Sequence, residues 1–330
     1  MPASGSWLGM FAPTISCLSR CMRVASATVI GVYQGSSLPT MTDCMTQDPI
    51  LSATRIVLHG MVVAGLWTCL YVAVKKLWVP WAWKRGLIGT TATEPSARAA
   101  FEGAAACRTV AVVHALVTCS LGVVSNLVVG PFAYAGIGLP NTPVQTLALQ
   151  VSLGYFFFDT AWSVIAGGET LLMLAHHMST TGACFCGLQL GASGAELVGA
   201  LFGAEVTNPL LQLRWFLLEN GGKGTSPVFA VEMAFALSFT ICRVFWAPTL
   251  LLPVLLSPLP HWSIRAGGSA LQIISWFWAA NVIAKFGPAI GAWRRRRQAS
   301  SSSNGSKSEG VTVSGSAGGS EVASGGDEPR

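Results

Sequence analysis

The residues best suited to chemistry in this chain are two adjacent histidines in an otherwise apolar stretch. His176 and His177 lie within a run of apolar residues, and Asp159 ends an aromatic block in the stretch before them. A histidine whose second ring nitrogen is held by a carboxylate can act as a general base or as an acyl-accepting nucleophile. We therefore predict that His176, His177 and Asp159 form a catalytic group in which Asp159 orients a histidine. The alternative is a buried polar network that only joins helices.

The two histidines are expected to point in different directions. Adjacent positions on an α-helix are rotated by about 100°. One histidine should then face the interior of the protein, while the other packs against, or bonds to, a neighbouring helix. Ionisable groups inside apolar segments are costly, and this cost marks both positions as candidates for function.

The composition places the chain among membrane proteins. It is 52% hydrophobic and only 10% charged over 330 residues, whereas soluble domains carry about 25% charged residues. The net charge of +6 does not indicate nucleic-acid binding, because the basic residues flank apolar segments and act there as topology signals. The nine cysteines lack the paired spacing of a zinc site, so we expect no metal site.

Seven apolar segments are predicted to cross the membrane as helices, which makes the fold an all-α integral membrane protein. They cover approximately residues 56–74, 107–130, 146–166, 169–190, 195–219, 228–256 and 268–293. Pro209 should kink the fifth segment, and Pro248 and Pro253 should split the sixth. Seven crossings place the basic flank of the first segment and the Arg294–Arg297 run on one side, which the positive-inside rule makes cytosolic.

The chain divides into four regions. Residues 1–50 form a disordered or targeting-like extension. Residues 51–106 hold the first transmembrane helix and a cytosolic linker. Residues 107–292 form a six-helix membrane domain. Residues 293–330 form a basic stop-transfer segment followed by a disordered Ser/Gly-rich cytosolic tail.

Several polar residues are predicted to share one layer in the cytosolic third of the membrane. The estimate counts a rise of about 1.5 Å per residue from the ends of each segment. Besides the histidine pair and Asp159, the layer contains His114, Glu232 and Lys285. We predict that these three side chains contact lipid or substrate.

The fifth segment adds two more charged residues. Glu205 lies nearer the middle of the membrane, where an unpaired carboxylate stays protonated or finds a partner such as Arg243 or a hydroxyl. Arg214 lies at the cytosolic end of this segment, and there it is an interfacial anchor or the partner of an acidic group.

Several motifs in these segments resemble those of the TLC-domain family, which includes the ceramide synthases. They occur in order as Leu153-Gly154-Tyr155 with Asp159, Met173-Leu174-Ala175-His176-His177, Leu201-Phe202-Gly203 with Glu205, and Thr207-Asn208-Pro209-Leu210-Leu211-Gln212 with Arg214-Trp215-Phe216. With Asn141-Thr142-Pro143 before them, they are most similar to the branch called TLC domain-containing protein five. The resemblance covers about residues 107–292.

The resemblance implies that the last six helices form a bundle around a lipid-sized cavity, with the histidine pair facing it. It also implies lipid or substrate contacts for the motif residues Tyr155, Glu205, Asn208 and Arg214. In ceramide synthases, the matching histidines are implicated in transferring a fatty acyl group from acyl-CoA to a sphingoid amine. This chain lacks the synthases' His-Asp pair and has Thr207-Asn208 in place of their Ser-Asp. It also lacks the Arg/Lys-rich stretch that precedes the histidine pair in the synthases. These departures count against ceramide synthesis itself.

The predicted function is the binding of an acyl chain or lipid inside the bundle by a multi-pass protein of lipid homeostasis. Its enzymatic form is acyl transfer with acyl-CoA as substrate, a histidine as base or acyl acceptor, and no cofactor. The alternative is a non-enzymatic lipid-binding regulator or cargo receptor; ion or solute transport has less support, because no inverted repeat is visible. The expected partners are membrane lipids or fatty acyl chains and no nucleic acid. The expected location is the endoplasmic reticulum or another endomembrane.

Overall fold

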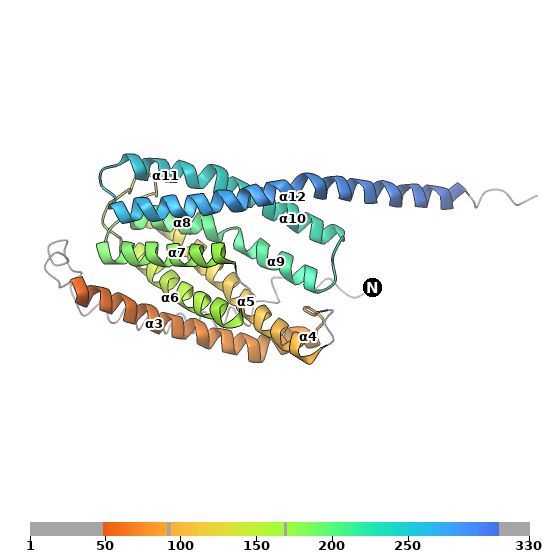
Figure 1. Cartoon of the computed structure of the whole chain (residues 1–330), viewed down its shortest axis with the longest axis horizontal. Coiled ribbons are helices and arrows are strands. Elements are labelled where there is room, and N and C mark those ends of the chain that lie inside the picture. The colour runs from red at the N-terminus through yellow and green to blue at the C-terminus, as the bar shows by residue number, and fades with distance from the viewer. Residues whose placement is uncertain (1–48, 91–93, 168–169, 310–330) are drawn as a thin grey trace, which may run out of the picture.

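A computed structural model describes residues 49–90, 94–167 and 170–309 of the chain. These residues fold mainly into helices (Figure 1). The elements named η are π-helical turns: η1 and η3 lie within longer helices, and η2 ends the helix that begins with α5. In chain order the elements are α3 Pro49–Ala73, η1 Val74–Trp78, α4 Val79–Lys84, α5 Pro95–Val123, η2 Val124–Val129, α6 Pro143–Ala166, α7 Leu171–Leu190, α8 Gly194–Glu205, α9 Asn208–Glu219, α10 Ser226–Thr240, η3 Ile241–Trp246, α11 Ala247–Leu256 and α12 Trp262–Glu309.

Successive helices run back and forth along a single bundle (Figure 1). α3 forms one edge and packs on α6, α6 packs on α7, and α7 packs on α12. α12 begins at one end of the bundle and projects well beyond the other end. Each apolar segment predicted from the sequence is a helix or a run of consecutive helices.

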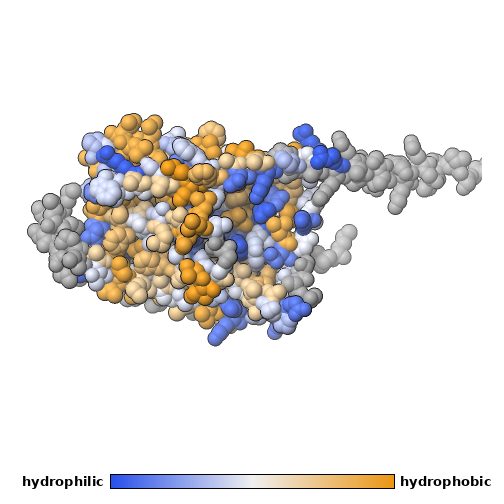
Figure 2. Space-filling view, viewed as in Figure 1, coloured by the Kyte–Doolittle hydropathy of each residue, from blue (hydrophilic) through white to orange (hydrophobic). Residues whose placement is uncertain are grey.

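The length and hydropathy of its helices identify the chain as a membrane protein. Among the described residues, three helical stretches are long and apolar enough to cross a membrane: Ser52–Lys84, Pro95–Val129 and Ser226–Leu256. Large apolar side chains such as Met61 and Val128 are exposed, and hydrophobic side chains cover much of the visible face (Figure 2). Such a surface suits lipid better than water. Membrane crossing by the other four predicted segments stays a prediction.

Prolines account for irregular turns in these helices. A proline has no N–H to donate to the carbonyl four residues earlier, which leaves that carbonyl unbonded and favours a wider π-turn. Pro80 and Pro248 each follow a π-turn that contains this carbonyl, namely η1 and η3. Pro209 acts in a similar way between α8, which ends at Glu205, and α9. The kink predicted in the fifth segment is therefore confirmed.

The start of α5 corrects the predicted boundary of the second segment. α5 begins at Pro95, inside the stretch predicted to be a linker. Alanine-rich sequence after this proline favours a helix. Tertiary packing then secures it, because the Phe101 ring lies 5.6 Å from Trp83 and 5.4 Å from Trp215.

The last two segments also differ from their predictions. The predicted split at Pro248 and Pro253 is wrong. The wider turn η3 lets the helix continue although Pro248 has no N–H to donate, and Pro253 lies inside α11. α12 continues past the predicted stop at Arg294–Arg297 and ends at Glu309. No glycine or proline interrupts residues 293–304, so the helix can propagate there. Almost all of the predicted N-terminal extension, and residues 310–330, lie outside the described residues.

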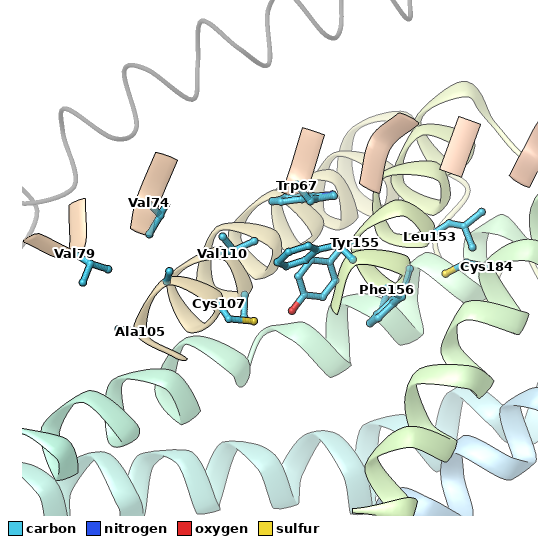
Figure 3. Close-up of a cluster of buried hydrophobic side chains, with 14 of the residues drawn as sticks. Trp67, Val74, Val79, Ala105, Cys107, Val110, Leu153, Tyr155, Phe156 and Cys184 are labelled. Carbon is cyan, nitrogen blue, oxygen red and sulfur yellow. The ribbon is translucent and has the colours of Figure 1, made fainter. Parts of the chain in front are cut away.

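A buried hydrophobic core joins α3, α5 and α6. Trp67, Val110 and Tyr155 meet there (Figure 3). Gly154 on α6 permits the close approach of α3, since a Cβ at this position would clash with Val63. This core fixes the helices that carry His114 and Asp159.

Candidate functional site

The two adjacent histidines of α7 lie in different surroundings. His177 is buried, and its Nδ1 lies 3.4 Å from Oδ2 of Asp159 on α6. The thiol of Cys107 on α5 donates to the other oxygen of this carboxylate over 3.7 Å. His176 packs instead against Trp278 of α12, with 4.9 Å between the ring centroids. The divergence agrees with the rotation of about 100° between neighbouring helix positions.

His176 lines a pocket whose walls extend over several turns of α8, α11 and α12. The pocket has a volume of about 120 Å³ and lies among α6, α7, α8, α11 and α12. Its lining on α12 extends from Ile264 to Ser275, a rise of about 16 Å at 1.5 Å per residue. The walls are mainly aliphatic and include Leu197, Leu201, Leu250, Val254 and Leu271.

Three ionisable side chains gather in one part of this pocket: His176, Glu205 and Arg243. They are close enough for electrostatic interaction with one another. His176 Nδ1 and Arg243 Nε are buried and have no hydrogen-bond partner among the described residues. Nine positions before Glu205 on the same helix, Glu196 also lines the pocket, and its Oε1 accepts the N–H of Gly138 at 2.9 Å.

A second polar group surrounds His114 of α5, which is fully buried. Its Nδ1 lies 3.6 Å from Oε2 of Glu205, and its Nε2 lies 3.0 Å from Oγ1 of Thr118. The Tyr155 ring stacks on the imidazole, with centroids 3.7 Å apart and an angle of 6° between the planes. Both His114 and Tyr155, predicted to contact lipid or substrate, therefore lie in the core and outside the pocket lining.

A row of hydrogen bonds runs from Glu205 along α9. Asn208 Nδ2 donates to Glu205 Oε2 over 3.0 Å, and Gln212 Nε2 donates to Asn208 Oδ1 over 2.6 Å. Arg108 Nη1 donates to Gln212 Oε1 over 2.8 Å, and its guanidinium lies over the ring of Trp215. This row joins α5, α8 and α9 and fixes Glu205 between His114 and the pocket.

Three of the predicted site residues lie outside both histidine environments. Arg214 Nε and Nη2 each lie 3.0 Å from Glu232 Oε1, so Arg214 has the acidic partner predicted as one of its two roles. Lys285 is exposed on α12. None of the three lines the pocket. The predicted layer is thus not a single cluster, because depth along a helix does not decide which face a residue occupies.

Glu196 and Arg243 are charged pocket residues that sequence reasoning did not identify as binding residues. The sequence indicates Arg243 only as a partner for Glu205. Two signals point to it: an arginine is costly inside an apolar segment, and π-turns such as the one before Pro248 often occur at functional sites. Over the described ranges, no group of three or more His, Cys, Asp or Glu residues is arranged to hold a metal ion.

A family model for the TLC domain matches residues 105–284, which is more than half of the chain. The chain belongs to the TLC-domain family. The matched range of this TLC-domain protein contains the histidine pair, Asp159, Glu205 and Arg243. Among solved structures, no match to the chain was found.

The geometry separates two properties that histidine catalysis requires together. A general base or nucleophile must reach the substrate and must be oriented by a partner. His177 faces Asp159, with 3.4 Å between Nδ1 and Oδ2, but it does not line the pocket. His176 lines the pocket and forms no ion pair with a described carboxylate. In this TLC-domain protein, no described histidine therefore both lines the pocket and pairs with a carboxylate.

Proposed function

We propose that this TLC-domain protein binds an acyl chain or lipid in the pocket beside His176 and acts in membrane lipid homeostasis. The observation that carries the proposal is an aliphatic pocket in which three ionisable side chains gather. Ligand pockets typically combine apolar walls with a few polar groups that fix orientation, and a lipid matches both parts. A volume of about 120 Å³ lies below the roughly 300 Å³ typical of small-molecule pockets. A lipid-sized cavity therefore requires the helices or side chains to move when the lipid enters.

Binding without turnover is the favoured form of this function. Its support is the separation of Asp159–His177 from the pocket histidine. A protein of this kind would regulate lipid composition or carry lipid cargo.

The second candidate is acyl transfer from acyl-CoA, and the position of His176 in the pocket favours it. In this reaction an imidazole nitrogen of His176 attacks the thioester carbonyl and CoA leaves as its thiolate. The acyl group then passes from the histidine to an acceptor hydroxyl or amine, whose proton goes to solvent or to CoA.

We also infer seven membrane crossings, a cytosolic C-terminus, an endomembrane location and membership of the TLC domain-containing protein five branch. The orientation is supported by basic residues at one end of the bundle. Lys84 ends α4 and Arg85 follows it, at the end where α12 leaves the bundle (Figure 1). Hydrophilic side chains gather near that end (Figure 2). Basic residues at one set of helix ends indicate the cytosolic side.

The test of lipid binding is native mass spectrometry of the full chain purified in digitonin. Ala183 lines the pocket and is partly buried, whereas Ala161 is exposed on α6, so Ala183→Phe and Ala161→Phe form a matched pair. We expect the lipid retained by the wild type to fall about tenfold in Ala183→Phe, a change of about 1.4 kcal/mol, and to persist in Ala161→Phe. Equal lipid content in all three proteins would refute the proposal.

Catalysis is tested separately with isotopically labelled acyl-CoA. An acyl adduct or transferred product that is present in the wild type and absent in His176→Ala would establish acyl transfer. If the wild type and His176→Ala both retain lipid and neither gives product, the non-enzymatic form stands.

A further inference from the structure

We propose that the pocket selects a single-chain lipid with a carboxylate head, a fatty acid, and that Arg243 is the residue that recognises the head. This inference rests on the proposed function and adds the chemistry of the ligand. Three observations carry it: the shape of the pocket, the unpartnered donor in its polar part, and the balance of charge there.

The shape of the pocket fits one chain. Its lining extends about 16 Å along α12, from Ile264 to Ser275, within a volume of about 120 Å³. Alanine side chains at positions 183, 200, 204 and 247 keep the passage open between larger aliphatic residues. Two acyl chains side by side would need a much wider space. A single extended chain requires the least movement of the helices.

The polar part of the pocket offers a donor without an acceptor. Arg243 Nε is buried and unbonded among the described residues, and its Nη1 makes only a 3.5 Å contact with Ser275 Oγ. A buried donor without a partner is costly, and a guanidinium matches the two oxygens of a carboxylate. His176 lines the same part of the pocket, with its Nδ1 also unbonded to any described residue. Together they present two donors to one acidic head.

Arg243 is held in place for this task. Its backbone carbonyl lies in the π-turn η3 and accepts the side-chain amide of Gln272 over 2.9 Å. Its guanidinium carbon lies 5.4 Å from the centre of the Phe239 ring. A fixed guanidinium loses less side-chain entropy when it binds a ligand.

The charges balance when the ligand enters as the protonated acid. The O–H bond of the acid breaks and its proton forms an O–H bond on Glu205, which gives a ligand carboxylate and an uncharged Glu205 side chain. The pocket then holds Arg243 as the cation and the ligand as the anion. Glu205 does not need Arg243 as its sole partner, because Asn208 donates to it and His114 lies 3.6 Å away. A neutral ester brings no proton and leaves the guanidinium without a counter-ion from the ligand.

The test compares lauric acid with methyl laurate, which share one chain and differ in the head. Binding is measured on the full chain in nanodiscs by displacement of a fluorescent fatty acid. We expect the wild type to bind the acid about 10- to 100-fold more tightly than the ester, as for a hydrogen-bonded charge. Arg243→Gln should remove this preference, and Arg243→Lys should keep part of it because the charge remains.

Arg265→Gln is the matched control. Arg265 also has a buried Nε without a hydrogen-bond partner in the described structure, but it does not line the pocket. This variant should keep the full preference for the acid, and its thermal unfolding shows what loss of a buried arginine does to folding alone.

The outcomes separate the two proposals. Equal affinity of the wild type for acid and ester would overturn the carboxylate head while leaving acyl-chain binding intact. An unchanged preference in folded Arg243→Gln would overturn the role of Arg243. If neither probe binds and no lipid co-purifies, the proposed function itself fails. If Arg243→Gln does not fold, Arg243→Lys decides the question. A preference of Arg243→Lys for the acid over the ester that equals the wild-type preference would exclude bidentate recognition by Arg243.

Discussion

The two halves of the bundle differ in how closely they pack around their buried polar groups. In the half formed by α3, α5 and α6, His114 is enclosed by Thr118, Tyr155 and Glu205, and the helices are in close contact. In the half formed by α7, α8, α11 and α12, a pocket remains beside His176 and Arg243. Buried nitrogens without a hydrogen-bond partner occur in both halves of the described structure, at His114 as well as at His176 and Arg243. The difference is the open space beside them, so the first half reads as scaffold and the second as a binding site.

The largest effect should come from removing the centre of the scaffold half. His114→Ala leaves Glu205 without its histidine and removes the ring stacked on Tyr155. Breaking a buried pair in this way costs about 3–5 kcal/mol, so we expect a large drop in thermal stability in detergent. His176→Ala, in the pocket half, should cost under about 1 kcal/mol. Equal losses in the two variants would break the distinction between the halves.

The next effect probes the packing that distinguishes the scaffold half. Gly154→Ala places a methyl group against Val63 between α3 and α6, and overpacking of this kind costs about 1–3 kcal/mol. Gly65→Ala on α3 is the control, because a Cβ there meets no atom within 4 Å. It should be neutral or stabilise by up to about 1 kcal/mol. Chemical or thermal unfolding of both variants decides whether the α3–α6 contact is as tight as the structure shows.

A double-mutant cycle measures which histidine belongs to the scaffold. Asp159→Asn and His177→Gln remove the two members of one pair, and we expect a coupling energy of about 0.5–3 kcal/mol in their unfolding. The matched cycle of Asp159→Asn with His176→Gln should give a smaller coupling, because His176 turns toward Trp278. The reverse order would mean that Asp159 orients the pocket histidine, which would favour acyl transfer.

The smallest effect is expected at the ion pair outside both histidine environments. Arg214 and Glu232 are each partly exposed, and such pairs contribute about 0.2–1 kcal/mol. Arg214→Gln should therefore leave both stability and bound lipid close to those of the wild type. A loss of lipid in this variant would show that the ligand reaches beyond the pocket.

The sequence identified the helices better than their ends. Apolar runs and prolines are local signals, and they were sufficient to predict the helical segments and the break at Pro209. The early start of α5 depends on contacts of Phe101 with Trp83 and Trp215, which are distant in the chain. The continuity through Pro248 depends on a π-turn that binds Gln272 of another helix. No local pattern contains either contact.

The candidate site divides in the same way. The sequence by itself determined the membrane class, the TLC-domain resemblance and the divergence of His176 from His177, because hydropathy, motif order and helical rotation are properties of neighbouring residues. Only the tertiary structure decided that Asp159 pairs with His177, that His176 lines the pocket, and that Arg243 joins it there. The physical reason is that depth in a membrane follows from counting residues, whereas the neighbours of a side chain are decided by how the helices pack around it.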